Sequence, residues 1–134
     1  MAEQIVIDAT GAALGRLASY AAKQALLGKS VVIINCNNAI IIGRTADIVG
    51  SYKQKAQRGK GTQKGPYFPR TPERIVKRTA RGMLEYTQQR GWDAFRRIIC
   101  HNETPKEFEA AKKITLAKEV KAKSIKLNNL VERV

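Results

Sequence analysis

The sequence predicts an α/β protein with a parallel sheet, and its opening segments are the main reason. Residues 4–8 are a short β-branched run, residues 9–11 supply turn chemistry, and an Ala- and Leu-rich segment follows. Residues 30–35 then form a continuous apolar run. Two strands joined by a helix pair in parallel, because a crossover brings the second strand alongside in the same direction. The opening is therefore predicted to be a strand–helix–strand unit.

The size and composition of the chain predict one domain over residues 1–134. The chain has 134 residues, of which 43% are hydrophobic and 27% are charged. This length is typical of a single domain, and the apolar fraction is high enough to build a buried core. A second independently folded unit is not expected.

The segment after the first turn is predicted to be a helix that packs by one face. Its apolar residues recur at helical spacing, and Gly28 provides a stop behind the last of them. Gly15, in the first turn, is interpreted as a point of close packing between this helix and the sheet. The inward positions are Leu14, Leu17, Ala18, Ala21 and Ala25.

The next part of the chain predicts a strand, a helix and a long arm. Residues 39–42 are strand-like, and residues 45–53 predict a helix with Ile48, Val49 and Tyr52 inward. After Lys53 the sequence shows no hydrophobic periodicity, and it contains several glycines and prolines. Residues 53–71 are therefore predicted to form a long basic arm, longer than most structureless loops.

A further helix is predicted from residue 72 to about residue 85. Thr71 can cap it, Pro72 suits its first position, and Glu73 suits the positive end of the helix dipole. These signals fix its start better than its end.

The last third of the chain is less regular. Residues 91–99 predict a helix or a helix that passes into a strand, with Trp92, Phe95 and Ile99 on one face. Residues 98–101 predict the last strand of the sheet. Behind Pro105, residues 106–113 predict a short helix, and the end of the chain carries no clear pattern.

The charge balance predicts a polyanionic partner. The chain has 25 Lys and Arg against 11 Asp and Glu, which gives a formal net charge of +14 and a pI near 10.2. Such an excess repels itself unless an anionic partner neutralises it. Residues 53–97 contain 13 basic residues and three acids, an excess of ten, so most of the charge is localised.

The helix after the arm is predicted to carry a cationic stripe. At about 100° per residue its four basic residues fall within an arc of roughly 100°, while Ile75, Val76, Thr79, Ala80 and Met83 face the other way. A charged stripe is usually a solvated face, but such faces mix signs and this one has no acid. We favour phosphate binding. Together the arm and stripe give the predicted RNA-binding residues Lys53, Lys55, Arg58, Lys60, Lys64, Arg70, Arg74, Lys77, Arg78 and Arg81.

Two aromatic residues, Tyr67 and Phe68, lie in the arm. They could stack on bases or anchor the arm to the domain, and the sequence does not decide between these roles. No recognition-helix motif is apparent, so folded RNA suits a cationic arm beside a rigid domain better than duplex DNA does.

The motifs that resemble catalytic or cofactor sites do not fit their chemistry. Residues 11–15 lack the middle glycine of a dinucleotide fingerprint, and residues 28–30 follow a helix where a phosphate loop follows a strand. Cys100 and His101 are adjacent, so on a strand they would point to opposite faces. No Cys, His, Asp or Glu cluster has metal-ligand spacing. We therefore expect no enzyme activity, no cofactor, no metal and no small-molecule substrate.

The expected location is the cytoplasm. The two apolar runs, residues 30–34 and 39–42, are separated by asparagines, so neither approaches the ~20 residues that a membrane span requires. No membrane partner is therefore expected. Residues 1–4 do not resemble a secretory signal. Cys36 and Cys100 are too few for a disulfide framework and are expected to be buried thiols in a reducing compartment.

Several segments resemble the family of ribosomal protein thirteen of the large subunit. The matching segments cover about the first 100 residues in the right order: 7–11, 14–18, 32–43, 65–67, 72–74 and, most specifically, Arg81-Gly82-Met83-Leu84. The resemblance implies a three-layer α/β/α fold with a mostly parallel four-stranded sheet. It also implies large-subunit rRNA and neighbouring large-subunit ribosomal proteins as partners, and a part in early subunit assembly. The short termini resemble those of archaeal members.

Two other functions remain as alternatives. One is a nucleotide- or anion-binding α/β enzyme, which added nucleotide would stabilise against heat. The other is a free-standing RNA chaperone, which would bind many unrelated nucleic acids tightly.

Overall fold

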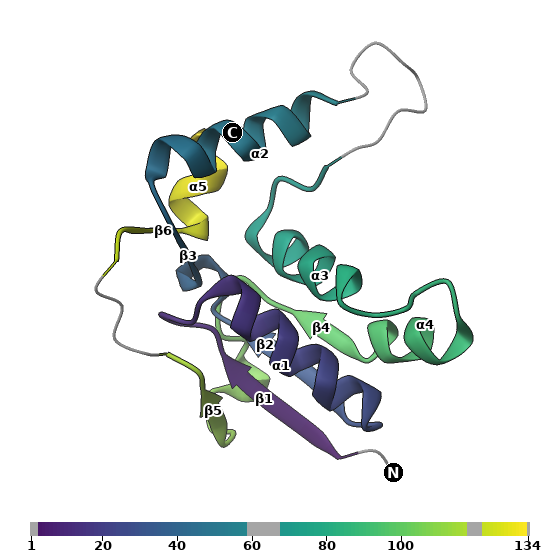
Figure 1. Ribbon diagram of the computed structural model, residues 1–134. Coiled ribbons are helices and arrows are strands. Elements are labelled where there is room, and N and C mark those ends of the chain that lie inside the picture. Colours follow the sequence, from purple (N-terminus) through teal and green to yellow (C-terminus); the bar gives the residue numbers. More distant parts are fainter. Residues whose placement is uncertain (1–2, 59–67, 118–121, 134) are drawn as a thin grey trace.

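The computed structural model describes residues 3–58, 68–117 and 122–133 (Figure 1). In chain order, the elements are β1 (Gln4–Asp8), α1 (Leu14–Leu26), β2 (Ser30–Ile34), the 3-10 helix η1 (Cys36–Asn38), β3 (Ile40–Ile42), α2 (Thr45–Gln57), α3 (Pro72–Gly82), α4 (Gln89–Arg96), β4 (Ile98–Cys100), the 3-10 helix η2 (Lys106–Phe108), β5 (Lys113–Thr115), β6 (Ser124–Lys126) and α5 (Leu127–Arg133).

The main sheet has four strands in the order β4, β2, β1, β5, and all of its pairings are parallel. The register places Ile7 opposite both Ile33 of β2 and Ile114 of β5. This confirms the parallel strand–helix–strand opening and the four-stranded sheet. β3, predicted as a further strand, lies outside this sheet and pairs antiparallel with β6.

The region behind Pro105 differs from the prediction. Where residues 106–113 were expected to form a helix, the chain makes only the 3-10 turn η2 and then enters β5. β5 is the edge strand beside β1, so β4 is not the last strand of the sheet along the chain. Three-residue strands are too short to show an alternating pattern, which is why the sequence did not reveal β5.

Helices α1, α3 and α4 cover one face of the sheet, and Figure 1 shows α1 across β1 and β2 with the other two beside it. Their apolar residues form one core with Ile7, Val31 and Ile33. On the other face, Val6, Val32 and Ile34 are covered by the segment around η2. The predicted three-layer α/β/α class is confirmed, with a thin third layer.

Helix α1 buries the five residues predicted to face inward, and Gly28 ends it with a φ of +94°. The interpretation of Gly15 was wrong. Gly15 is exposed, and a Cβ added to it would have no heavy atom within 4 Å. Leu14 and Leu17 face the core, whereas Gly15 between them lies at the exposed surface of α1.

Helix α2 is longer than predicted. It runs to Gln57, so Lys53 and Lys55 belong to a helix and not to an arm. Ile48 is buried, and Val49 and Tyr52 are half-buried, as predicted. The last turn of α2 contains only good helix formers but faces solvent on most sides, so it has no hydrophobic period to reveal it.

Helix α3 begins at Pro72 as predicted and ends at Gly82, before Glu85. Thr71 holds the N-cap position but makes no side-chain capping hydrogen bond. The backbone N–H of Glu73 instead donates to Oδ1 of Asn102, 3.0 Å away. The capping group therefore comes from a segment beyond β4, which no local pattern predicts.

Of the three residues predicted to share one face of the segment 91–99, only Phe95 is half-buried against the core. Trp92 is 42% exposed and Ile99 in β4 is 49% exposed, while Gly91 and Ala94 are buried. A Cβ on Gly91 would lie 2.0 Å from the carbonyl oxygen of Glu85. The helix packs through its small residues because the chain behind α3 turns back very close to it.

Polar side chains join the carboxyl ends of β1 and β2. Oδ1 of Asp8 accepts hydrogen bonds from the backbone N–H of Thr10 at 3.0 Å and from Nδ2 of Asn35 at 3.2 Å. Asn35 has a φ of +59°, and its Oδ1 accepts from Oγ1 of Thr104 at 3.0 Å. Burial acts to raise the pKa of Asp8, but these hydrogen bonds and the charge of Lys113 outweigh it and lower the pKa.

This lowered pKa predicts that acid weakens the fold through Asp8. Ionised Asp8 stabilises the folded state fully above the pKa of the unfolded chain, near 4, and this contribution is lost as the pH falls through the lower folded-state pKa. Asp8→Asn keeps the acceptor oxygen but removes the charge. Urea unfolding should show a smaller loss of stability between neutral pH and about pH 3 in the variant. An equal loss of stability in the wild type and in Asp8→Asn would contradict the lowered pKa of Asp8.

Candidate nucleic-acid interface

The cationic stripe of α3 lies opposite its buried face, as predicted. Arg74 and Arg78 are exposed, and Lys77 and Arg81 are half-buried. On the other side of the helix the core positions are Ile75, Val76 and Ala80. Met83 was wrongly assigned to that side. It is 46% exposed, because the helix has already ended at Gly82.

Aromatic rings hold three of these cations. Nζ of Lys77 lies 4.9 Å from the ring centre of Phe95, and Cζ of Arg78 lies 4.9 Å from that of Phe68. Cζ of Arg81 lies 4.9 Å from the ring centre of Tyr86. The negative face of an aromatic ring attracts a cation by about 0.5–1 kcal/mol at exposed sites. The stripe is therefore partly ordered before any ligand binds.

Helix α2 contributes to the same aromatic arrangement. The rings of Tyr52 and Phe68 meet edge to face with centroids 5.7 Å apart. Nζ of Lys55 lies 5.0 Å from the first ring centre and 5.5 Å from the second. Phe68 therefore anchors the end of the arm between α2 and α3, one of the two roles left open for it. Tyr67 lies outside the described residues.

A hollow in the surface, which we call the cationic hollow, has a volume of about 500 Å³. Five predicted site residues line it together with two aromatic rings, and none of the residues lining it is acidic. Its lining consists of Phe68, Pro69, Arg70, Thr71, Arg74, Lys77, Arg78, Arg81 and Phe95. The hydroxyl of Thr71 is buried there and has no hydrogen-bond partner. Donors without nearby carboxylates are suited to phosphate oxygens.

The other predicted site residues lie elsewhere or are not described. Lys53 and Arg58 are exposed on α2 and at its end, outside the cationic hollow. Lys60 and Lys64 lie outside the described residues. Tyr52, predicted only as an inward residue of its helix, also belongs with the site residues; the signal for this was its spacing of three residues from Lys55, which puts both on one side of a helix.

The basic segment also contains a cation with a structural role. Nη1 of Arg97 donates to the carbonyl oxygen of Ala25 at 2.9 Å, at the end of α1. The C-terminal carbonyls of a helix are unpaired and carry partial negative charge, so this hydrogen bond satisfies one of them. It also links the end of α1 to the residue that precedes β4. Net charge alone therefore overstates the number of cations available to a ligand.

The cysteines and the histidine form no nucleophilic pair. Cys100 packs against the main core, while the ring of His101 lies 6.2 Å from that of Phe108 on the other side of the sheet, as the adjacency predicted. Cys36 is buried, Cys100 is half-buried, and both thiols are free. A hydrogen bond with Cys100 and burial raise the pKa of Cys36, which keeps that thiol protonated.

Three other features are relevant to a functional role: the turn at Gly11, groups of metal-binding side chains, and helices long enough to span a membrane. Gly11 has a φ of +72°, and a Cβ added to it would lie 3.3 Å from the Cβ of Ala117. Glycine is therefore required here by the geometry of the turn. Among the described residues no group of His, Cys, Asp and Glu could hold a metal ion. Within the same ranges no helix has the length and apolar character of a membrane span.

These features define a class of protein: a basic α/β protein in which the described part of the chain forms an acid-free cationic surface on α3. Comparison with known proteins identifies the family. A sequence model of the family "Ribosomal protein L13" matches residues 2–107. The chain belongs to the ribosomal protein L13 family.

Several archaeal relatives are similar over most of the chain, and each is named large ribosomal subunit protein uL13. The protein of Archaeoglobus fulgidus is 48% identical over 104 residues, which cover 78% of this chain and 66% of that one. The protein of Methanosarcina barkeri is 46% identical, over 84% of this chain and 80% of that one. The protein of Methanopyrus kandleri is 45% identical, over 81% of this chain and 68% of that one.

The family membership confirms the resemblance found in the sequence, including its archaeal character. It also confirms that the chain is not an enzyme, since the relatives are named as ribosomal proteins. The predicted cytoplasmic location is in agreement with membership of a ribosomal protein family.

Proposed function

We infer that this protein is a structural constituent of the large ribosomal subunit that binds large-subunit rRNA and takes part in early subunit assembly. The observation that carries this proposal is the acid-free surface of α3, where Arg74, Lys77, Arg78 and Arg81 converge on one hollow. The relatives are named as proteins of the large ribosomal subunit, and this is why we propose that particle for this protein.

The chemistry of the surface supports RNA in preference to other anions. Lys and Arg neutralise phosphates without reading sequence, and the planar guanidinium groups can donate two parallel hydrogen bonds to one phosphate. Aromatic rings beside cationic groups, here the half-buried Phe68 and Phe95 and the exposed Tyr86, are typical of proteins that stack on unpaired bases. The set Lys53, Lys55, Arg58, Lys60, Lys64 and Arg70 would extend the contact beyond α3.

The neighbouring partners are proposed to be other large-subunit ribosomal proteins. Apolar side chains with large exposed fractions lie away from the cationic hollow, at Leu27 (64%) and Ile99 (49%). These side chains are open to contact with a neighbouring protein in an assembled particle.

Sedimentation of a cell lysate tests the proposal directly. We expect the tagged full-length protein to migrate with large ribosomal subunits and with subunit precursors, and to leave them when salt is raised. The rival functions give other results: a free-standing chaperone would spread over unrelated RNAs, and a nucleotide-dependent enzyme would stay in the light fractions and be stabilised by nucleotide. Either pattern without subunit association would overturn the proposal.

A further inference from the structure

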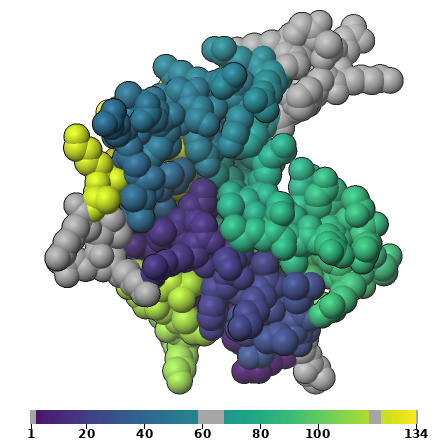
Figure 2. All heavy atoms as spheres, viewed as in Figure 1, coloured from purple at the N-terminus to yellow at the C-terminus, as the bar shows by residue number. Residues whose placement is uncertain are grey.

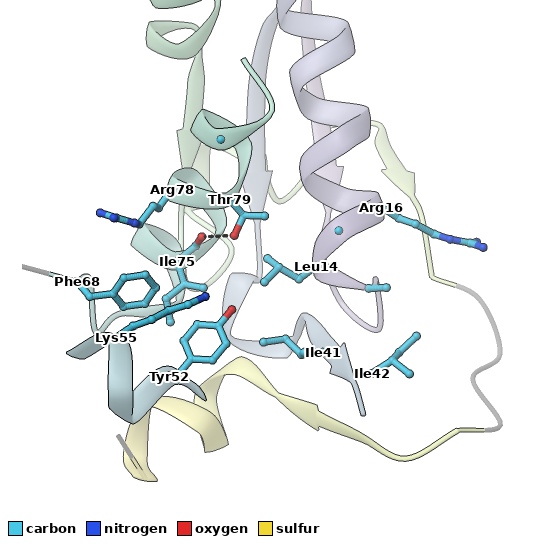
Figure 3. A pocket seen from close by; sticks show the side chains of 13 residues that line it. Leu14, Arg16, Ile41, Ile42, Tyr52, Lys55, Phe68, Ile75, Arg78 and Thr79 are labelled. Carbon is cyan, nitrogen blue, oxygen red and sulfur yellow. Dashed lines mark hydrogen bonds between the residues drawn. The ribbon is translucent and has the colours of Figure 1, made fainter. Parts of the chain in front are cut away.

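A second cavity adjoins the cationic hollow and has a different character. Its volume is about 660 Å³, and α1, β3, α2 and α3 all contribute walls. We call it the apolar pocket. Figure 3 shows Leu14, Ile41 and Ile75 around it, with the hydroxyl of Tyr52 and the ammonium of Lys55 pointing into the space between them. No residue lining it is acidic.

The pocket joins an apolar floor to a few polar groups. This combination is typical of sites for small ring-shaped ligands, which such cavities of ~300–1,000 Å³ enclose. Burial raises the pKa of Tyr52, so its phenol is neutral at physiological pH and can both donate and accept a hydrogen bond. Lys55 adds donors only.

Two residues line both cavities. The ring of Phe68 and the side chain of Arg78 stand between the apolar pocket and the cationic hollow, with Cζ of Arg78 4.9 Å from the ring centre. Figure 2 shows the recess between α2, at the top, and the green surface of α3 and α4 on the right. A ligand that spans this ridge places an anion on one side and an apolar ring on the other.

A nucleotide is such a ligand. We propose that the apolar pocket receives an unpaired nucleobase of the bound RNA, whose phosphates lie in the cationic hollow. A base within a helix cannot enter, because its faces are stacked and its edge is paired, whereas an unpaired base in a loop or bulge can leave the strand. This inference rests on the proposed rRNA binding and adds that the protein recognises single-stranded positions.

Three exposed glycines in helices allow a test that changes no charge. Gly82 of α3 and Gly15 of α1 line the pocket from different walls, and a Cβ on either would meet nothing within 4 Å. Gly82→Leu and Gly15→Leu therefore add an apolar side chain at the wall of the pocket, from a Cβ that meets no neighbour, and Leu favours a helix more than Gly does. Gly50→Leu in α2 is the matched control, because Gly50 is equally open but lines none of the described cavities.

The experiment compares the affinity of the full chain for two probes, an archaeal large-subunit rRNA transcript and a fully paired RNA duplex. Stacking of a single base contributes enough to predict about a tenfold loss of rRNA affinity in Gly82→Leu and in Gly15→Leu. Affinity for the duplex should not change, and Gly50→Leu should behave as the wild type with both probes.

The outcomes separate this inference from the proposed function. If the pocket-filling variants are folded by circular dichroism and bind rRNA as tightly as the wild type, the pocket receives no base and the inference fails, while rRNA binding stands. If they lose affinity equally for both probes, the loss does not concern an unpaired base and the inference also fails. If the wild type binds neither probe, the proposed function itself is wrong.

Discussion

Reversing the charge of Arg74, Arg78 and Arg81 to Glu should lower the affinity for large-subunit rRNA on the order of 100-fold, since about 1 kcal/mol is lost at each of three phosphate contacts. All three side chains line the cationic hollow, and no residue lining it is acidic. The slope of log affinity against log salt, about −0.9 per phosphate neutralised on duplex nucleic acid, should become shallower by roughly two to three units.

The fold should survive this change. The three residues lie on the side of α3 away from Ile75 and Val76, and the lost ring contacts with Phe68 and Tyr86 contribute only about 0.5–1 kcal/mol each. Filter binding over a salt series measures the affinity, and circular dichroism checks the fold.

The matched control reverses three exposed cations elsewhere, Lys23, Lys112 and Arg133, and so makes the same change in net charge. A general effect of charge would weaken both triple variants equally. If the α3 variant is folded and keeps the affinity and salt slope of the wild type, the stripe is only a solvated face. Loss confined to the α3 variant identifies the cationic hollow as the place where phosphates bind.

Gly91→Ala should destabilise the protein by about 3 kcal/mol or more, at the upper end of what overpacking costs. The added Cβ would lie 2.0 Å from the carbonyl oxygen of Glu85 and 2.4 Å from its carbonyl carbon. Backbone atoms cannot rotate away as a side chain does, so α4 has to move from the chain that follows α3. Chemical denaturation measures the change in the free energy of unfolding.

The control for this prediction is Gly50→Ala, in the exposed part of α2. Its Cβ would meet nothing within 4 Å, so the only expected effect is the better helix propensity of Ala, a gain of up to about 1 kcal/mol. Equal effects of the two substitutions, or an unchanged stability in Gly91→Ala, would mean that α4 does not approach Glu85 so closely.

Local periodicity predicted the elements that are long enough to show it. The burial of Leu14, Leu17 and their neighbours in α1 followed from a repeat of 3.6 residues, and the two sides of α3 followed from the same repeat. The apolar run at residues 30–34 identified the central strand β2. The cationic stripe was likewise predictable, because charge and helical spacing are both properties of the sequence.

Elements that depend on distant partners could not be predicted in this way. β5 has only three residues, and its place beside β1 is decided by pairing with a strand more than 100 positions earlier in the chain. In α4, Trp92 is exposed and Gly91 is buried, because the chain at Glu85 approaches so closely that only a glycine fits at position 91. In both cases the available space, and not local hydrophobicity, decides the outcome.

The sequence by itself determined that this is a basic α/β protein, that its cations concentrate between residues 53 and 97, and that one side of α3 is cationic. Only the tertiary structure decided that Asn102 caps α3 and that Phe68 brings Lys55 and Arg78 to one ridge. The reason is physical: composition and helical period act within a few turns of chain, whereas a ring under a cation or an acceptor at a helix end is supplied by whichever segment packs there.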